Sequence, residues 1–119
     1  MDYSKMSDFE INMAIAKALQ YPTMKKQHFG EAGLSVVMLE VGYGGHFDPC
    51  KNAADAWPII VSNKIDIDWG DNHTPELIDH VSANTVTKSG KLIAFDVNTK
   101  ENNPLRAAML VYLQLREAK

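Results

Sequence analysis

The C-terminal segment constrains the fold most, because its apolar residues cover more than one face of the helix that they predict. Asn103 and Pro104 are typical of a helix start, since asparagine can cap a free backbone N–H and proline at the first helical position has none to satisfy. Along one helical face lie Leu105, Ala108, Met109, Tyr112 and Leu113, and the stripe is widened by Leu110, Val111 and Leu115. We therefore expect this helix to contact two surfaces, or a second copy of the protein.

A second helix is predicted near the N-terminus. Ser7 and Glu10 stand three residues apart, where each side chain can accept a hydrogen bond from the other's backbone N–H. Behind this capping box, apolar residues recur at helical spacing: Ile11, Ala14, Ile15, Ala18 and Leu19. The pattern predicts a helix from about Asp8 to Gln20, ended by Tyr21 because a residue before proline is disfavoured in helical conformation.

The middle of the chain mixes strand and helix signals. Leu34–Val41 is aliphatic and partly β-branched, which predicts a strand covered on most of its surface. Asn52 is a plausible cap for a third helix, which should bend at Pro58 or start later, near Asp55. One face of that helix holds Ala53, Ala56, Trp57 and Ile60. Lys64–Trp69 then alternates between polar and apolar residues, as a strand with one covered face does.

The rest of the chain predicts further strands, which together with the helices indicate an α+β fold. Residues 85–97 predict a hairpin with a tight turn at Ser89–Gly90, while segment 74–81 fits a helix, a strand or a loop. The element order is α-β-α-β-β-β-α, in a chain of 119 residues. We expect a single α+β domain spanning 1–119, with helices packed on a small, mostly antiparallel sheet.

Charge and cysteine content narrow the range of partners and compartments. Twelve Lys and Arg residues stand against fifteen Asp and Glu, for a formal net charge of −3, which disfavours nucleic acid and anionic membrane surfaces as partners. The lone cysteine, Cys50, forms no internal disulfide and fits a reducing compartment. With no visible signal peptide or membrane-spanning apolar run, we expect a cytoplasmic protein.

One short segment gathers residues that could carry chemistry. His46, Asp48 and Cys50 lie at alternate positions with Asp55 nearby, and these are the ligand types of zinc and iron sites. Their spacing matches no standard metal site, however, and Asp48 before Pro49 is typical of a turn. We expect these side chains to stabilise the fold, with no catalytic residue, metal or cofactor. The alternative is a small metal- or nucleotide-dependent enzyme centred on His46–Asp55.

Two tryptophans and one arginine could also take part in binding. Trp57 and Trp69 could stack on the ring of a ligand, but large aromatic residues belong more often to the core, where we place them. Arg106 could pair with Asp48 or Asp55 across the fold, or could be solvated.

Three sequence blocks carry a resemblance to a known family. They are Ser7–Asn12 (SDFEIN), the segment 47–60 with Phe47-Asp48-Pro49-Cys50 and Ala54–Ile60, and Asn103–Met109 (NPLRAAM). In order and spacing they resemble the NinX-like family of small lambdoid phage and prophage proteins. The helix with Trp57, followed by an Ala-rich C-terminal helix, is also distantly similar to the phage α-β-α sandwich domain. The resemblance implies a phage or prophage origin, a place in the host cytoplasm and a family without an established activity, so no catalytic residue is carried over.

These observations favour a non-catalytic protein-binding or adaptor module. Its partner would be a host or phage protein, and a homodimer through the C-terminal helix is a further expectation. The residues that we single out as candidates for binding are His46, Asp48, Cys50, Asp55, Trp57 and Arg106.

Overall fold

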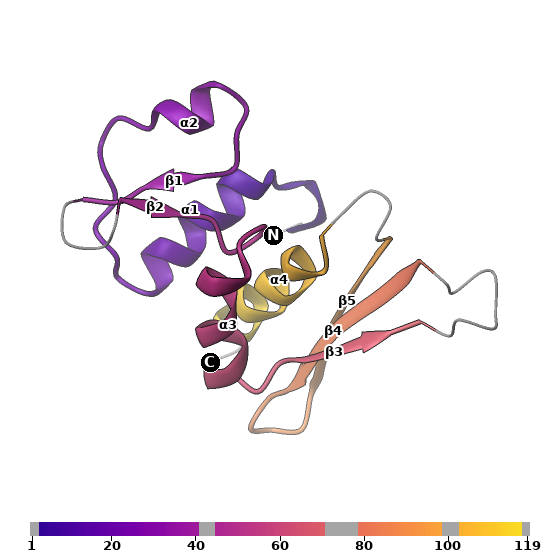
Figure 1. The fold of residues 1–119 in the computed structure, drawn as a ribbon. Helices are drawn as coiled ribbons and strands as arrows, with labels where there is room; N and C mark the ends of the chain where they lie inside the picture. Colours follow the sequence, from indigo (N-terminus) through magenta and orange to yellow (C-terminus); the bar gives the residue numbers. More distant parts are fainter. Residues whose placement is uncertain (1–2, 41–44, 71–78, 99–102, 118–119) are drawn as a thin grey trace.

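The computed structural model describes residues 3–40, 45–70, 79–98 and 103–117 (Figure 1). The elements in chain order are η1 (Tyr3–Lys5), α1 (Asp8–Ala18), α2 (His28–Glu31), β1 (Val37–Met38), β2 (His46–Phe47), α3 (Ala53–Ser62), β3 (Asp66–Trp69), β4 (His80–Val86), β5 (Leu92–Asn98) and α4 (Pro104–Glu117). Both sheets are antiparallel, with orders β1-β2 and β3-β4-β5. The predicted α+β class is therefore confirmed. The predicted order lacked η1, α2 and β2.

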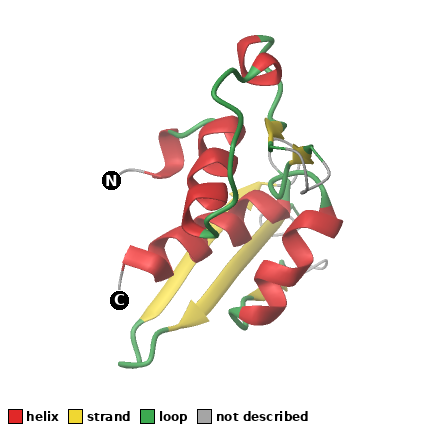
Figure 2. Cartoon of the chain, turned by 90° about the vertical axis from the view of Figure 1, so that its left-hand side faces the viewer, coloured by secondary structure: helices red, strands yellow, loops and turns green. Residues whose placement is uncertain are grey.

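Helix α4 lies at the centre of the fold. Asn103 caps it, since its Oδ1 accepts a hydrogen bond of 2.9 Å from the backbone N–H of Leu105. One side of α4 contacts the three-stranded sheet, and α1 and α3 also pack against it. Figure 2 shows α4 lying across the strands of that sheet. Seven successive residues, Ala107 to Leu113, are buried. The broad apolar stripe thus contacts two surfaces within one chain, which is one of the two outcomes that the sequence predicted.

Helix α1 begins with the predicted capping box. The backbone N–H of Glu10 donates to Ser7 Oγ at 3.1 Å, and the backbone N–H of Ser7 donates to Glu10 Oε1 at 3.0 Å. The helix ends at Ala18 instead of Gln20, because Gln20 takes a left-handed conformation with φ of 63°.

The three-stranded sheet has one covered and one exposed face. Alternate residues of β4 and β5 are buried, among them Val81, Ala83, Thr85, Ile93 and Val97. The hairpin turn is where the sequence predicted it, with Gly90 at φ of 90°. Strand β4 begins at His80, further upstream than the expected hairpin. Of the ambiguous segment 74–81, residues 74–78 lie outside the described part of the chain.

Two other expectations need correction. Within Leu34–Val41 only Val37 and Met38 form a strand, and burial alternates instead of covering both faces; Val41 lies outside the described residues. The third helix does not start late, near Asp55, but runs from Ala53 to Ser62 with Pro58 inside it. Pro58 and Ala54 are both exposed, so water can reach the carbonyl that the missing N–H leaves free.

Candidate functional site

A buried polar network occupies much of the segment that the sequence analysis singled out. The Asp48 carboxylate accepts hydrogen bonds from Asn12 Nδ2 at 2.7 Å and from Ser35 Oγ at 2.8 Å. Asn12 Nδ2 also donates to the Ser35 carbonyl at 2.9 Å, and Asn12 Oδ1 accepts from the Cys50 backbone N–H at 3.1 Å. Asp55 Oδ2 accepts from the Asp48 backbone N–H at 2.9 Å. The network therefore joins α1, the approach to β1 and the turn before α3.

Asn12 is the residue of this network that sequence reasoning missed. Its side chain is fully buried, although it belongs to the apolar face of α1 beside Ile11, Ile15 and Ala16. A polar residue within an otherwise apolar helical stripe was the available signal, because a buried amide needs partners for its donors and its acceptor.

The other two candidate ligands of the segment, Cys50 and His46, lie in different environments. Cys50 is fully buried, and burial, followed by the Asp8 carboxylate, raises the pKa of its thiol far above the ordinary value. His46 is exposed on β2, with its ring edge-to-face against Phe29 at 5.2 Å between centroids. Among the described residues, no group of three or more His, Cys, Asp or Glu side chains could hold a metal ion.

Arg106 pairs with a different carboxylate from those expected. Its Nη1 donates to Asp8 Oδ1 at 2.7 Å and its Nη2 donates to the Met6 carbonyl at 2.7 Å. The carboxylates of Asp48 and Asp55 are bonded within the network instead. Arg106 therefore ties the start of α4 to the start of α1, at a site that is only slightly exposed.

The two tryptophans are the largest departure from expectation, because both were placed in the core. Trp57 is 63% exposed and Trp69 is 71% exposed. On α3 the buried residues are Ala56, Ile59 and Ile60. The buried side therefore includes Ile59 in place of Ala53 and Trp57, which belonged to the predicted face.

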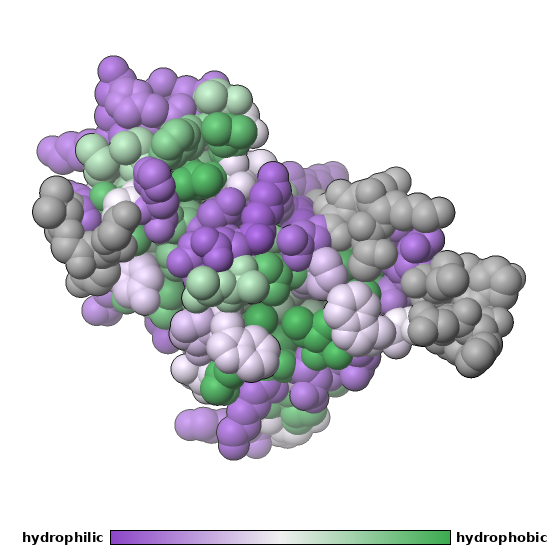
Figure 3. All heavy atoms as spheres, viewed as in Figure 1, coloured by the Kyte–Doolittle hydropathy of each residue, from purple (hydrophilic) through white to green (hydrophobic). Residues whose placement is uncertain are grey.

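The outward face of α3 carries no charge. It consists of Ala53, Ala54, Trp57, Pro58, Val61 and Ser62, all of them exposed. We call these six residues the α3 face. The only charged residue of the helix, Asp55, is half-buried and bonded to the Asp48 backbone. Exposed faces of surface helices are normally polar or charged, so an apolar one with a tryptophan indicates a surface that a partner can cover. Figure 3 shows green and pale atoms gathered over α3 and the neighbouring β3.

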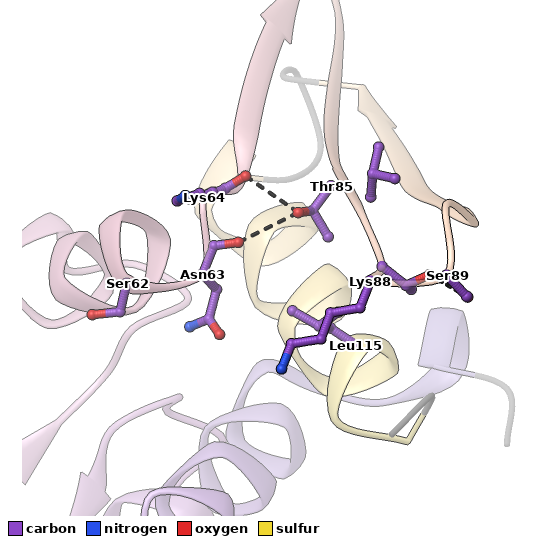
Figure 4. A pocket seen from close by; sticks show the side chains of 9 residues that line it. Ser62, Asn63, Lys64, Thr85, Lys88, Ser89 and Leu115 are labelled. Carbon is purple, nitrogen blue, oxygen red and sulfur yellow. Dashed lines mark hydrogen bonds between the residues drawn. The ribbon is translucent and has the colours of Figure 1, made fainter.

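Two hollows border the α3 face. One, of about 350 Å³, runs beside the helix and has Ala54, Pro58 and Ser62 on its α3 wall. The other, of about 660 Å³, lies at the C-terminal end of α3 and is closed below by Leu115 of α4 (Figure 4). Ser62 and Asn63 line both hollows, so the depression continues around the end of the helix.

The hollow at the end of α3 is lined by a fixed backbone. The Thr85 hydroxyl lies 3.3 Å from the Asn63 carbonyl and 3.2 Å from the Lys64 carbonyl, and it holds the α3–β3 corner against β4. On the opposite side, Thr87 Oγ1 accepts from the Lys91 backbone N–H at 3.0 Å and braces the hairpin turn.

Comparison with known proteins identifies a family. The family described as bacteriophage P22 NinX matches residues 2–116. Comparison with curated proteins and with solved structures gives no significant match. No helix in the described part of the chain is long and apolar enough to cross a membrane. Because the match spans nearly the whole sequence, the chain belongs to the NinX family of bacteriophage proteins.

Proposed function

We propose that this phage protein is a non-catalytic binding module that attaches to a host or phage protein through the α3 face. The observation that carries the proposal is an exposed helix face with Trp57 at its middle and no charged side chain. Tryptophan is enriched among the residues that dominate binding energy, and charged residues are depleted at the centres of interfaces.

The α3 face also has the support that a binding surface needs. Ala56, Ile59 and Ile60 anchor the inner side of α3 in the core, and α3 packs against α4. The outer side chains therefore project from a rigid element, which lowers the entropy lost on binding. The hollow beside Ala54, Pro58 and Ser62 offers a place for a partner's side chain next to the exposed ring of Trp57.

The alternatives have less support. An enzyme centred on His46–Asp55 would need free functional groups, whereas the carboxylates of Asp48 and Asp55 are hydrogen-bonded to the protein and Cys50 is buried. A homodimer through α4 would need exposed apolar residues on that helix, and Ala107 to Leu113 are buried in one chain.

The test compares two double variants with the wild type, each carried as a tagged copy in phage-infected cells. Trp57→Ser with Val61→Ser removes the apolar centre of the α3 face. Leu34→Ser with Leu92→Ser removes two apolar side chains of similar exposure elsewhere, at 52% and 63%. A truncated hot spot costs about 2 kcal/mol or more, which is roughly 30-fold in Kd.

We expect one protein to co-purify at constant ratio with the wild type and with the Leu34/Leu92 control, and to be lost with the α3-face variant. Thermal unfolding of all three forms checks that they are folded. Equal recovery with all three forms would remove the α3 face as the binding surface, and no co-purifying protein would remove the proposed function.

A further inference from the structure

We infer that the partner segment is acidic as well as apolar, and that a carboxylate of this segment enters the hollow at the end of α3 between Lys64 and Lys88. The inference rests on the proposed function, since it names the chemistry of the partner at the same surface.

The first step is the charge around the hollow. Lys64 and Lys88 both line it, and no carboxylate is among the described residues that line it. Neither lysine forms an ion pair with any residue that the structure describes. The chain as a whole is acidic, with a formal net charge of −3, so two unpaired cations at one hollow run against the overall charge. A potential of this sign selects a negatively charged partner group.

The second step is the shape of the hollow. Leu115 forms its floor, and Val86, which is 60% exposed, forms part of its wall. Figure 4 shows the Lys88 side chain extending past Leu115 towards the side of the hollow where Asn63 lies. A hollow that has an apolar floor and two lysines among its lining residues suits a carboxylate on an aliphatic stem, such as a glutamate side chain or the C-terminus of an apolar peptide.

The third step is the fixed position of the two lysines. Lys64 has φ of 52° at the corner that the Thr85 hydroxyl holds, and Lys88 belongs to the turn that Thr87 Oγ1 braces. The backbones that carry the charges are therefore set before binding, although the side chains themselves are exposed. Lys64 follows the α3 face by two residues, so one bound segment can cover Val61 and reach the lysines.

A polyanion is a weaker fit than an acidic peptide. Two lysines neutralise few phosphates, and binding to a phosphate backbone depends on the number that is neutralised. A phosphate backbone also offers no apolar surface that could cover the α3 face next to the hollow.

The experiment selects binders from a displayed library of random 12-residue peptides. Three forms of the full chain serve as targets. These are the wild type, Lys64→Glu with Lys88→Glu, and a matched control, Lys25→Glu with Lys26→Glu, which changes the net charge equally at exposed lysines of the 22–27 segment. A fourth selection uses Trp57→Ser with Val61→Ser. A fluorescent single-stranded DNA oligonucleotide is titrated against the wild type at the same salt concentration.

We expect wild type and control to enrich peptides that combine apolar residues with Asp, Glu or a free C-terminal carboxylate. The Lys64/Lys88 variant should shift the enriched sequences towards Lys and Arg and weaken a wild-type-selected peptide about tenfold. Amidating the peptide's C-terminus and replacing its Glu by Gln tell the two carboxylate sources apart.

The outcomes separate the inference from the proposed function. Apolar peptides without acidic enrichment, or equal binding by the Lys64/Lys88 variant, overturn the inference and leave the α3 face in place. Tighter binding of the oligonucleotide than of any peptide also overturns the inference. Enrichment that survives in the Trp57/Val61 variant overturns the proposed surface itself.

Discussion

Asn12 links separate segments of the chain from one buried position. Its amide donates to Asp48 and to the Ser35 carbonyl, and its carbonyl oxygen accepts from the Cys50 backbone. No buried side-chain polar atom among the described residues lacks a hydrogen-bond partner. Since an unpaired buried polar group costs about 1–3 kcal/mol, the network stabilises the fold only while all its members are present.

Asn12→Ala should destabilise the protein by about 3 kcal/mol, because it leaves the Asp48 carboxylate and the Cys50 N–H short of a partner. Urea unfolding followed by circular dichroism measures the change. Asn84→Ala is the matched control: its amide bonds Asp68 on the exposed face of the sheet, and its loss should cost less than about 0.5 kcal/mol. Equal midpoints for Asn12→Ala and the wild type would show that the network contributes nothing.

Cys50 gives the chain a pH dependence in alkaline solution. Burial raises the pKa of the folded thiol above its ordinary value of 9.0, so above that pH the unfolded chain releases a proton that the folded chain retains. The thiol's contribution is intact below pH 9 and is lost as the pH rises. Between pH 8 and pH 10 the wild type should lose about 1.4 kcal/mol more stability than Cys50→Ala. Parallel pH profiles for the two proteins would contradict this assignment.

The features of helices that could be predicted from the sequence are those that depend on residues close together in the chain. The Ser7–Glu10 capping box and the Asn103 cap involve residues two or three positions apart, so their geometry can be deduced from spacing. The partners of Asn12 lie 23 to 38 residues away, and no local pattern specifies them. For α3, the stripe alone left the buried side ambiguous, because apolar residues occur around the whole helix. Trp57 was therefore assigned to the wrong side.

The short helix α2 packs on α1 through a glycine. A Cβ at Gly30 would lie 2.6 Å from the Phe9 ring, closer than side chains approach one another. Gly30→Ala should therefore destabilise the protein by about 1–3 kcal/mol, measured by thermal unfolding. In a double-mutant cycle, Phe9→Ala should remove most of that cost, because the ring is no longer present. Additive effects of the two substitutions would contradict this packing.

Across the fold, the two sides of the segment 46–62 differ in chemistry and in what they contact. Its inner side, with Asp48, Cys50 and Asp55, holds α1, the approach to β1 and the turn before α3 together. Its outer side, the α3 face, is apolar and ends near Lys64 and Lys88. We propose that a partner covers the outer side, whereas the inner side contributes stability.

Site-specific photo-crosslinking in phage-infected cells tests whether a partner covers the α3 face. A photo-reactive amino acid replaces Val61 on the α3 face or, in the control, Leu92 on β5, two positions that are 55% and 63% exposed. We expect a crosslink to one discrete protein from position 61 and none from position 92. The same crosslinks from both positions, or none from position 61, would contradict it.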